Sequence, residues 1–446
     1  MLDAGPTPLV SRRQNRMHMR RHLSRSESLY AGEMRTQAVR MCTVRGGVDP
    51  DALDAAFAAV LADHPSLRSR LEQDAEGGFL SLLKPDELPR PVVRPDGPDV
   101  LVQEWNTPLP LGGPLVRAVL LTGEHEDTLL LGVDHAICDG RSATALCFRL
   151  WRYYADIKAG TLPADRPVQE DWPAAIDDRL APVTEADVAS YVQARLDRAE
   201  GAPVAALPYL AARSGEVAPG RGRTQSRRLR LTASETTALL ANARSAEVSV
   251  HGLVGAAILK AVRAALPAEY AGHRLACFST VDLRERVEPE LSREVMVPAA
   301  SWYQDLVDVP AGADLVALGR RLGAGLSAAV DRGDPALELR SLDRLLATPQ
   351  LLAASLVMTN IGRVTLPPSP PGLEIVDMRG FAVSSKAPSF LQHGPVLASL
   401  TTVRDRFRIE MPYSTECFTE EQMDAVHDHV GATLREFTDR TPVPVG

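Results

Sequence analysis

The chain has 446 residues, of which 45% are hydrophobic, and a formal net charge of −8. A chain of this length exceeds what one hydrophobic core usually organises, so we expect two lobes of ordinary domain size. Because proteins that bind nucleic acids usually carry a surplus of positive charge on one face, the acidic balance predicts that this chain has no nucleic-acid partner.

Cysteine usage and hydropathy bear on the compartment and on bound groups. The five cysteines are widely spaced and include no CxxC pair, which favours reduced thiols over a disulfide framework or a zinc site. No run of about 18 apolar residues is present, and the stretch 1–25 lacks the apolar core of a signal peptide. We therefore expect a cytoplasmic protein with no membrane span and no bound metal.

Residues 1–22 are predicted to form a basic N-terminal arm. Arginines occur in and just after it, at positions 12, 13, 16, 20, 21 and 25. Such a run can dock an acidic carrier protein, but a run of like charges is more often only a solvated arm.

The N-terminal lobe is expected over 23–170, where strand and helix patterns alternate. Its predicted elements are a strand over 36–44, a helix over 52–62, the two strands of a hairpin over 116–121 and 128–133, and a helix over 142–159. The hairpin's second strand therefore delivers the chain to a strand-to-helix turn over 134–140.

Frequent prolines between residues 160 and 226 interrupt the periodic pattern and predict a linker region over 171–225, with one helix near 185–199. The C-terminal lobe is expected over 226–446. Its predicted elements are strands over 225–231, 274–280, 354–358, 396–403 and 407–412, a helix after residue 232, and helices over 251–266 and 419–437. These patterns predict an α/β fold with two lobes, each a mixed sheet flanked by helices.

The turn itself carries the candidate chemistry, in the run Asp134-His135-Ala136-Ile137-Cys138-Asp139-Gly140. A histidine at such a turn can act as a general base because its ordinary pKa lies near neutrality. Spacing alone is weak evidence, since Asp and Gly are common turn residues and an arbitrary HxxxDG is usually a surface loop with a helix cap.

Several stretches in order give this motif a family context. The run resembles the active-site signature of the superfamily of condensation domains, chloramphenicol acetyltransferase and BAHD acyltransferases. Further stretches with the same resemblance are Leu23-Ser24-Arg25-Ser26-Glu27, the segment 64–71, Thr280-Val281-Asp282-Leu283-Arg284 and the segment 370–375. Together they are most similar to the polyketide-associated acyltransferases of the phthiocerol/phthiodiolone dimycocerosyl transferase type. The resemblance runs from about residue 22 to the C-terminus.

The resemblance implies two chloramphenicol-acetyltransferase-like lobes with the active site in the cleft between them. It also implies roles for single residues. His135 matches the base that deprotonates an acceptor for direct attack on a thioester. Asp139 matches the aspartate that pairs with the arginine corresponding to Arg284, and Gly140 matches the glycine that leaves room for the substrate channel.

Two further residues are weighed as supporting groups. The family usually carries two consecutive histidines, and Asp134 stands here in place of the first. Because neighbouring residues at a strand end point to opposite sides, Asp134 is predicted to be a supporting group rather than a base. Asn360, in a TNIGR stretch that resembles bacterial relatives, could donate to the oxyanion, although a turn-forming asparagine is at least as common.

The sequence therefore predicts a cofactor-free acyltransferase of actinobacterial natural-product or lipid biosynthesis. Its donor would be a thioester on a carrier protein's phosphopantetheine, supplied by a polyketide synthase, or on CoA. Its acceptor would be the hydroxyl, or alternatively the amine, of a small molecule. Two rivals stay open: a condensation-like enzyme that cyclises a carrier-bound chain or forms an amide, and a non-catalytic scaffold that binds carrier proteins.

Overall fold

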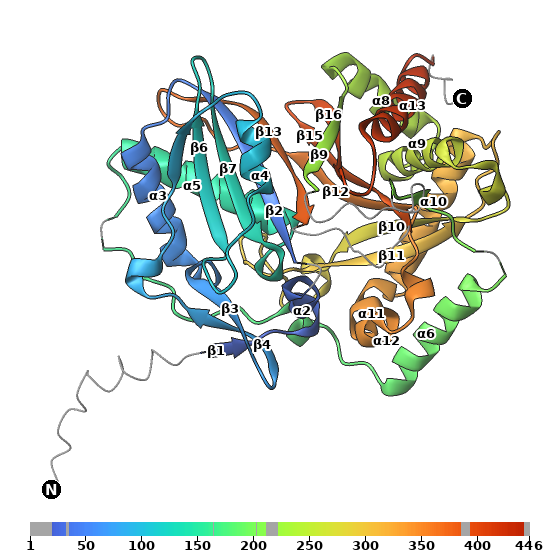
Figure 1. Cartoon of the computed structure of the whole chain (residues 1–446), viewed down its shortest axis with the longest axis horizontal. Helices are drawn as coiled ribbons and strands as arrows, with labels where there is room; N and C mark the ends of the chain where they lie inside the picture. Colours follow the sequence, from blue (N-terminus) through green and yellow to red (C-terminus); the bar gives the residue numbers. More distant parts are fainter. Residues whose placement is uncertain are drawn as a thin grey trace, which may run out of the picture.

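A computed structural model describes residues 20–32, 35–163, 165–201, 203–210, 222–384 and 393–440. The N-terminal lobe is built on a five-stranded mixed sheet (Figure 1). Its strands, in spatial order, are β13 (Glu374–Ser384), β2 (Thr36–Arg45), β7 (Asp127–Asp134), β6 (Val116–Thr122) and β5 (Val92–Pro95). One face packs against α3 (Pro50–Asp63) and α5 (Gly140–Lys158), and the short α4 (Val100–Asn106) covers part of the other face.

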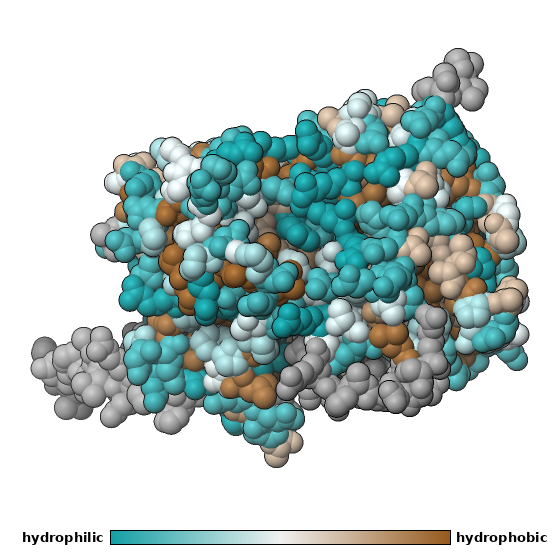
Figure 2. Space-filling model, turned by 45° about the horizontal axis from the view of Figure 1, so that its top comes forward, coloured by the Kyte–Doolittle hydropathy of each residue, from teal (hydrophilic) through white to brown (hydrophobic). Residues whose placement is uncertain are grey.

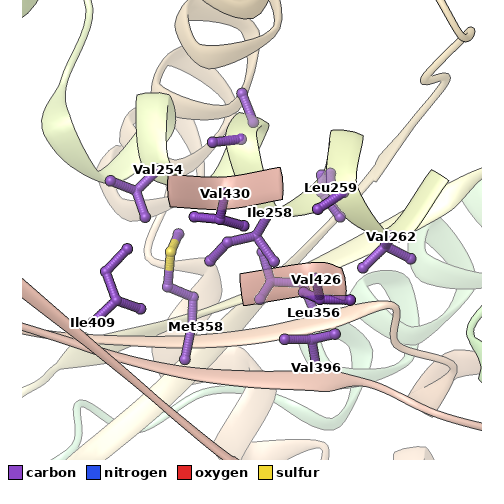
Figure 3. Close-up of a cluster of buried hydrophobic side chains, with 14 of the residues drawn as sticks. Val254, Ile258, Leu259, Val262, Leu356, Met358, Val396, Ile409, Val426 and Val430 are labelled. Atoms are coloured by element: carbon purple, nitrogen blue, oxygen red, sulfur yellow. The ribbon is translucent and has the colours of Figure 1, made fainter. Parts of the chain in front are cut away.

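The C-terminal lobe is built on a six-stranded mixed sheet. Its strands, in spatial order, are β11 (Ala300–Val307), β10 (Leu275–Asp282), β12 (Leu356–Val364), β15 (Val396–Val403), β16 (Arg406–Ser414) and β9 (Thr224–Arg230). One face is covered by α8 (Ala233–Ser245), α9 (Val250–Ala265), α10 (Leu315–Asp331) and α13 (Glu420–Thr438). Figure 3 shows side chains of α9 and α13 meeting those of β12, β15 and β16 in this core.

These two sheets confirm the predicted fold class, a two-lobed α/β protein with helices flanking each mixed sheet. The predicted hairpin is formed by β6 and β7, and the predicted helix after the turn is α5. The boundaries of α3 follow from its ends: Asp49 caps the first turn through its side chain, and Pro50 takes a position where no N–H is needed.

One strand of the N-terminal sheet comes from beyond residue 226, where the C-terminal lobe is predicted to begin. Strand β13 lies within the range expected for the C-terminal lobe, yet it pairs along its whole length with β2 of the N-terminal sheet. The pairing covers an edge of β2 that would otherwise expose unsatisfied backbone groups. The later part of the chain therefore contributes one strand to the N-terminal sheet.

The end of the predicted N-terminal arm pairs with other parts of the chain. Strand β1 (Arg20–His22) joins β4 (Gly77–Leu82) and β3 (Ser69–Asp74) in a small sheet. Ion pairs join Arg20 to Asp74, Arg21 to Glu27 and Arg25 to Asp343. These three arginines of the basic run thus have partners within the chain, whereas Arg12, Arg13 and Arg16 lie outside the described residues.

Further elements lie at several places along the sequence. They include α2 (Arg25–Ala31), η4 (Ile176–Arg179), α6 (Glu185–Ala199), α11 (Asp334–Arg340), α12 (Leu342–Leu346) and the strand pair β8 (Leu207–Pro208) with β14 (His393–Gly394). Helix α6 lies in the predicted linker region and is tied to the C-terminal lobe by a buried pair, Arg195 to Glu338. In Figure 1, α2 lies between the two lobes.

A network of charges joins the lobes where β13 runs beside the C-terminal sheet. Asp377 of β13 binds Arg228 of β9, at 2.8 Å, and Arg408 of β16. Arg379 of β13 binds Glu410 of β16 at 2.9 Å. Figure 2 shows mostly hydrophilic residues in the middle of the face in view. Burial by itself would raise the pKa of Asp377, but these arginines hold it below its ordinary value.

Two further properties concern only the described residues. No single helix among them is long and apolar enough to cross a membrane, and the one helix pair that passes by length and composition, α8 with α9, is bent by 102°. In the same part of the chain, no group of three or more His, Cys, Asp or Glu side chains is arranged to hold a metal ion.

Candidate functional site

The predicted motif forms a tight connection between β7 and α5. Strand β7 ends at Asp134, residues His135–Ile137 form a single 3₁₀ turn, η3, and α5 begins at Gly140. Asp139 caps α5, because its Oδ1 accepts hydrogen bonds from the amides of Arg141 at 3.0 Å and Ser142 at 2.9 Å. A strand, a capped turn and a core-packed helix therefore fix the place of His135.

His135 is a titratable side chain of the motif that forms no ion pair with a described residue. Its ring stacks on the ring of Tyr30, with centroids 4.1 Å apart and 21° between the planes. Its Nδ1 is buried and makes no hydrogen bond of normal geometry to a described residue. Burial lowers the pKa of His135 below its ordinary value, outweighing the raising effects of Asp139 and of the residue's own carbonyl. The imidazole is therefore neutral at neutral pH.

Asp139 and Arg284 are brought together by the two lobes. The Arg284 Nη1 donates to the Asp139 Oδ2 at 2.5 Å, and the Ala299 amide donates to the same oxygen at 2.9 Å. Both side chains are buried. Burial alone would raise the pKa of Asp139, but the Arg284 guanidinium and the hydrogen bonds bring it below its ordinary value. Asp139 is thus a charged carboxylate whose oxygens are fully engaged away from His135.

Asp134 is completely buried and holds two other groups. Its Oδ2 accepts from the Arg35 Nε at 2.8 Å, and its Oδ1 accepts from the Ala136 amide at 3.0 Å. Burial raises the pKa of Asp134, with Arg35 and the Ala136 amide acting against it. The carboxylate therefore stiffens η3 and anchors Arg35, the residue before β2.

We expect Asp134→Asn to cost less than about tenfold in turnover, because an amide can still accept from Ala136 and support the turn. The melting temperature should fall, since Arg35 loses its charged partner in a largely buried position. Steady-state kinetics at matched concentrations of folded protein measure the first effect. A loss of turnover as deep as that of a variant lacking His135 would place Asp134 in the chemistry.

Gly140 lies where the second lobe approaches the motif. A Cβ at this position would lie 2.7 Å from the Ile361 Cδ1 and 3.1 Å from the Arg40 Nη2, and contacts under 3.0 Å require a neighbour to move. The glycine therefore permits close approach of β12 to the turn. The substrate channel expected at Gly140 stays a prediction.

Asn360 lies on β12, next to the residue that packs against Gly140. Its Oδ1 accepts from the Gly362 amide at 2.9 Å, where a bulge interrupts the pairing of β12 with β15. The structure thus gives Asn360 a local role in shaping the strand and shows no hydrogen bond from it to the motif. Its role as an oxyanion donor stays a prediction.

Three residues around the motif were not found from the sequence: Tyr30, Arg35 and Arg40. Arg40 is buried in β2 and donates to the Thr144 Oγ1 at 3.0 Å and to the Gly140 carbonyl at 2.6 Å. A charged residue inside an otherwise apolar strand was a usable signal, because arginines are seldom buried without a specific partner. Tyr30 and Arg35 had no comparable signal, since the contact of Tyr30 depends on where α2 lies and that of Arg35 on the pairing of β2 with β7.

Two family models and several known proteins are similar to this chain. The condensation-domain family model matches residues 7–293, and the model described as the C-terminus of phthiocerol/phthiodiolone dimycocerosyl transferase matches 220–412. A phthiocerol/phthiodiolone dimycocerosyl transferase from Mycobacterium sp. (strain JLS) is 27% identical over 381 residues, covering 80% of this chain and 85% of the relative.

Two solved structures share the fold. The polyketide synthase associated protein 5 of Mycobacterium tuberculosis superposes with a TM-score of 0.71 at 23% identity, covering 94% of this chain and 98% of that one. The TRI3 trichothecene 15-O-acetyltransferase of Fusarium sporotrichioides gives a TM-score of 0.74 at 12% identity, covering 94% and 95%. The chain belongs to the condensation-domain family, and its C-terminal part also matches the model described as the C-terminus of phthiocerol/phthiodiolone dimycocerosyl transferase.

Proposed function

We propose that this acyltransferase moves an acyl group from a thioester, carried on phosphopantetheine or CoA, to a hydroxyl acceptor, with His135 as general base. One observation carries the proposal. The two carboxylates of the turn, Asp134 and Asp139, are engaged by arginines, and burial raises the pKa of the Cys138 thiol. The imidazole of His135, by contrast, is neutral and forms no ion pair with a described residue. A neutral imidazole can accept a proton from the attacking hydroxyl.

The proposed reaction is a single displacement. His135 removes the hydroxyl proton as the acceptor oxygen forms a bond to the thioester carbonyl carbon. The C–S bond then breaks, and the proton returns from the imidazolium to the departing sulfur. Because Nδ1 is buried in the protein, Nε2 is the nitrogen that would exchange the proton. General-base assistance of this kind contributes about 10²- to 10⁴-fold to the rate.

Residues of the chain hold the turn that carries His135, while the thioester and the acceptor are the two substrates. Asp139 and Arg284 hold the turn, and Arg40 donates to the carbonyl of Gly140, the first residue of α5. No step draws on a further cofactor. A carrier protein of a polyketide synthase is the proposed source of the thioester, which is supported by the likeness to a polyketide synthase associated protein.

The experiment that tests the proposal is an incubation of the purified chain with an acyl-loaded carrier protein, the matching acyl-CoA, and one alcohol or one amine acceptor. Mass spectrometry should detect the ester, with free carrier thiol formed in equal amount. Amide formation alone would favour the condensation-like alternative. Tight binding of the loaded carrier without any product would favour the non-catalytic scaffold.

The lowered pKa of His135 sets the pH dependence. Protonation removes the base, so kcat/KM should fall as pH decreases through a value below about 6.5, the ordinary histidine pKa, and should be flat around neutral pH. Burial raises the pKa of the neighbouring Cys138 thiol well above its ordinary range. A rate that rises only in alkaline solution would therefore point to Cys138 and contradict the assignment of His135. Initial rates across this range, with folding checked at each pH, measure the profile.

A further inference from the structure

Helix α2 places an aromatic ring directly against the base. Tyr30 belongs to this helix, and its ring lies parallel to the imidazole of His135, with centroids 4.1 Å apart. We propose that Tyr30 is a positioning residue that holds the imidazole of His135 in its reactive orientation through this stack, an inference that rests on the function proposed above.

The carboxylates near the turn do not orient the imidazole of His135. A catalytic histidine is usually held by a hydrogen bond from one ring nitrogen to a carbonyl or carboxylate. Nδ1 of His135 interacts with the residue's own carbonyl but makes no hydrogen bond of normal geometry to a described residue, and the two nearby carboxylates, Asp134 and Asp139, bind Arg35 and Arg284 instead. The stack on Tyr30 is therefore the contact by which another side chain orients the ring.

The helix that carries Tyr30 is itself fixed from several sides. The Ser26 hydroxyl donates to Asp177 of η4, and Glu27 binds Arg21 at 2.7 Å. Arg25 reaches Asp343 of α12, in the second lobe, at 3.2 Å. Figure 1 shows α2 between the two lobes, where these contacts can hold it against both. The ring of Tyr30 is thus held by the assembled two-lobe structure and not by the motif alone.

The chemistry of the phenol limits what Tyr30 can do. Burial, assisted by Asp139, raises the pKa of the Tyr30 hydroxyl well above its ordinary value, so Tyr30 remains protonated and is not a second base. When His135 takes up a proton, the electron-rich ring face attracts the imidazolium. The other charged groups that act on His135 are Asp139, which favours its protonated form, and Arg40, which opposes it. Tyr30 would therefore help to orient the neutral imidazole and to stabilise its protonated form.

Two substitutions separate the ring from the hydroxyl. Tyr30→Phe keeps the stack, so its kcat should stay within about threefold of the wild type, whereas Tyr30→Leu should lose roughly 10- to 100-fold in kcat, because small errors in geometry are costly in catalysis. The KM for the acceptor should change little in either variant, since Tyr30 acts through His135. Tyr270→Leu is the matched control: Tyr270 also contacts a histidine, His393, outside the motif, and its loss should leave kcat unchanged.

A spectroscopic measurement tests the stack without using activity. In a protein labelled with ¹³C-histidine, the His135 Cε1–H signal is identified by its absence from the spectrum of His135→Ala. Its ring-current shift should persist in Tyr30→Phe and disappear in Tyr30→Leu. If thermal melting shows that the leucine variant does not fold, Tyr30→Met takes its place.

The outcomes separate this inference from the proposed function. Activity in His135→Ala would overturn the function, whatever Tyr30 does. With His135 shown to be required, wild-type kcat in Tyr30→Leu would overturn the positioning role, and so would a phenylalanine variant as slow as the leucine variant, because the hydroxyl would then be the active part. An unchanged His135 shift in Tyr30→Leu would show that the rings do not stack in solution.

Discussion

His135→Ala should lower turnover by roughly two to four orders of magnitude, the contribution expected of a general base. Folding should be nearly unaffected, because η3 is held by the Asp134 carboxylate and α5 by the Asp139 cap, neither of which the substitution removes. The stack on Tyr30 is lost, which costs about 0.5–1.5 kcal/mol at most. Steady-state rates and thermal melting of the same preparation measure both quantities.

His251→Ala is the matched control for this variant. This histidine is also buried, and burial lowers its pKa to about 4, but it lies on α9 of the second lobe and contacts Ser279 at 2.8 Å. Loss of that contact should affect stability more than turnover per folded molecule. Near-full activity in His135→Ala would remove the general-base assignment.

The second large effect concerns Asp139 and Arg284. Asp139→Ala leaves the Arg284 guanidinium buried without its main partner, and such an uncompensated charge typically costs about 3–5 kcal/mol. It also removes the cap of α5, worth about 0.5–2 kcal/mol. Total stabilities of proteins are about 5–15 kcal/mol, so soluble yield and melting temperature should both fall markedly. Arg284→Ala should act in the same direction.

The pairing itself is tested by the double variant. Removing the second charge relieves the first, so the Asp139→Ala, Arg284→Ala protein should be less destabilised than the sum of the two single losses in denaturant unfolding. Strict additivity would show that the pair does not act as one. The buried pair Arg195 and Glu338 offers a matched control, because Glu338→Ala should cost similar stability without lowering turnover per folded molecule.

The sequence predicts those parts of the site that are formed by residues close together in the chain. Alternating apolar residues, a cap-forming aspartate and helical spacing predicted the hairpin, the turn and α5, because each depends on neighbouring residues. The contact between Asp139 and Arg284 was expected only from family resemblance. The 145 positions between them carry no periodic signal that links the two residues.

The parts that were missed depend on long-range packing. Strand β13 joins a sheet whose other strands lie more than 240 positions earlier, and its pairing with β2 follows from the free edge of that strand and not from any local pattern. Tyr30 reaches His135 only because α2 is fixed to both lobes. Asp134 stands where the family usually carries a histidine. Its ion pair with Arg35 gives it a structural role that the sequence did not reveal.

The most direct measurement of the central claim is a single-turnover reaction of excess enzyme with an acyl-loaded carrier protein and an alcohol acceptor, followed by intact-protein mass spectrometry. The wild-type chain should form the ester while its own mass stays unchanged, and His135→Ala should bind the carrier but form the ester at least a hundredfold more slowly. An enzyme that gains the mass of the acyl group on the path to product, or an alanine variant as fast as the wild type, would contradict direct transfer assisted by His135.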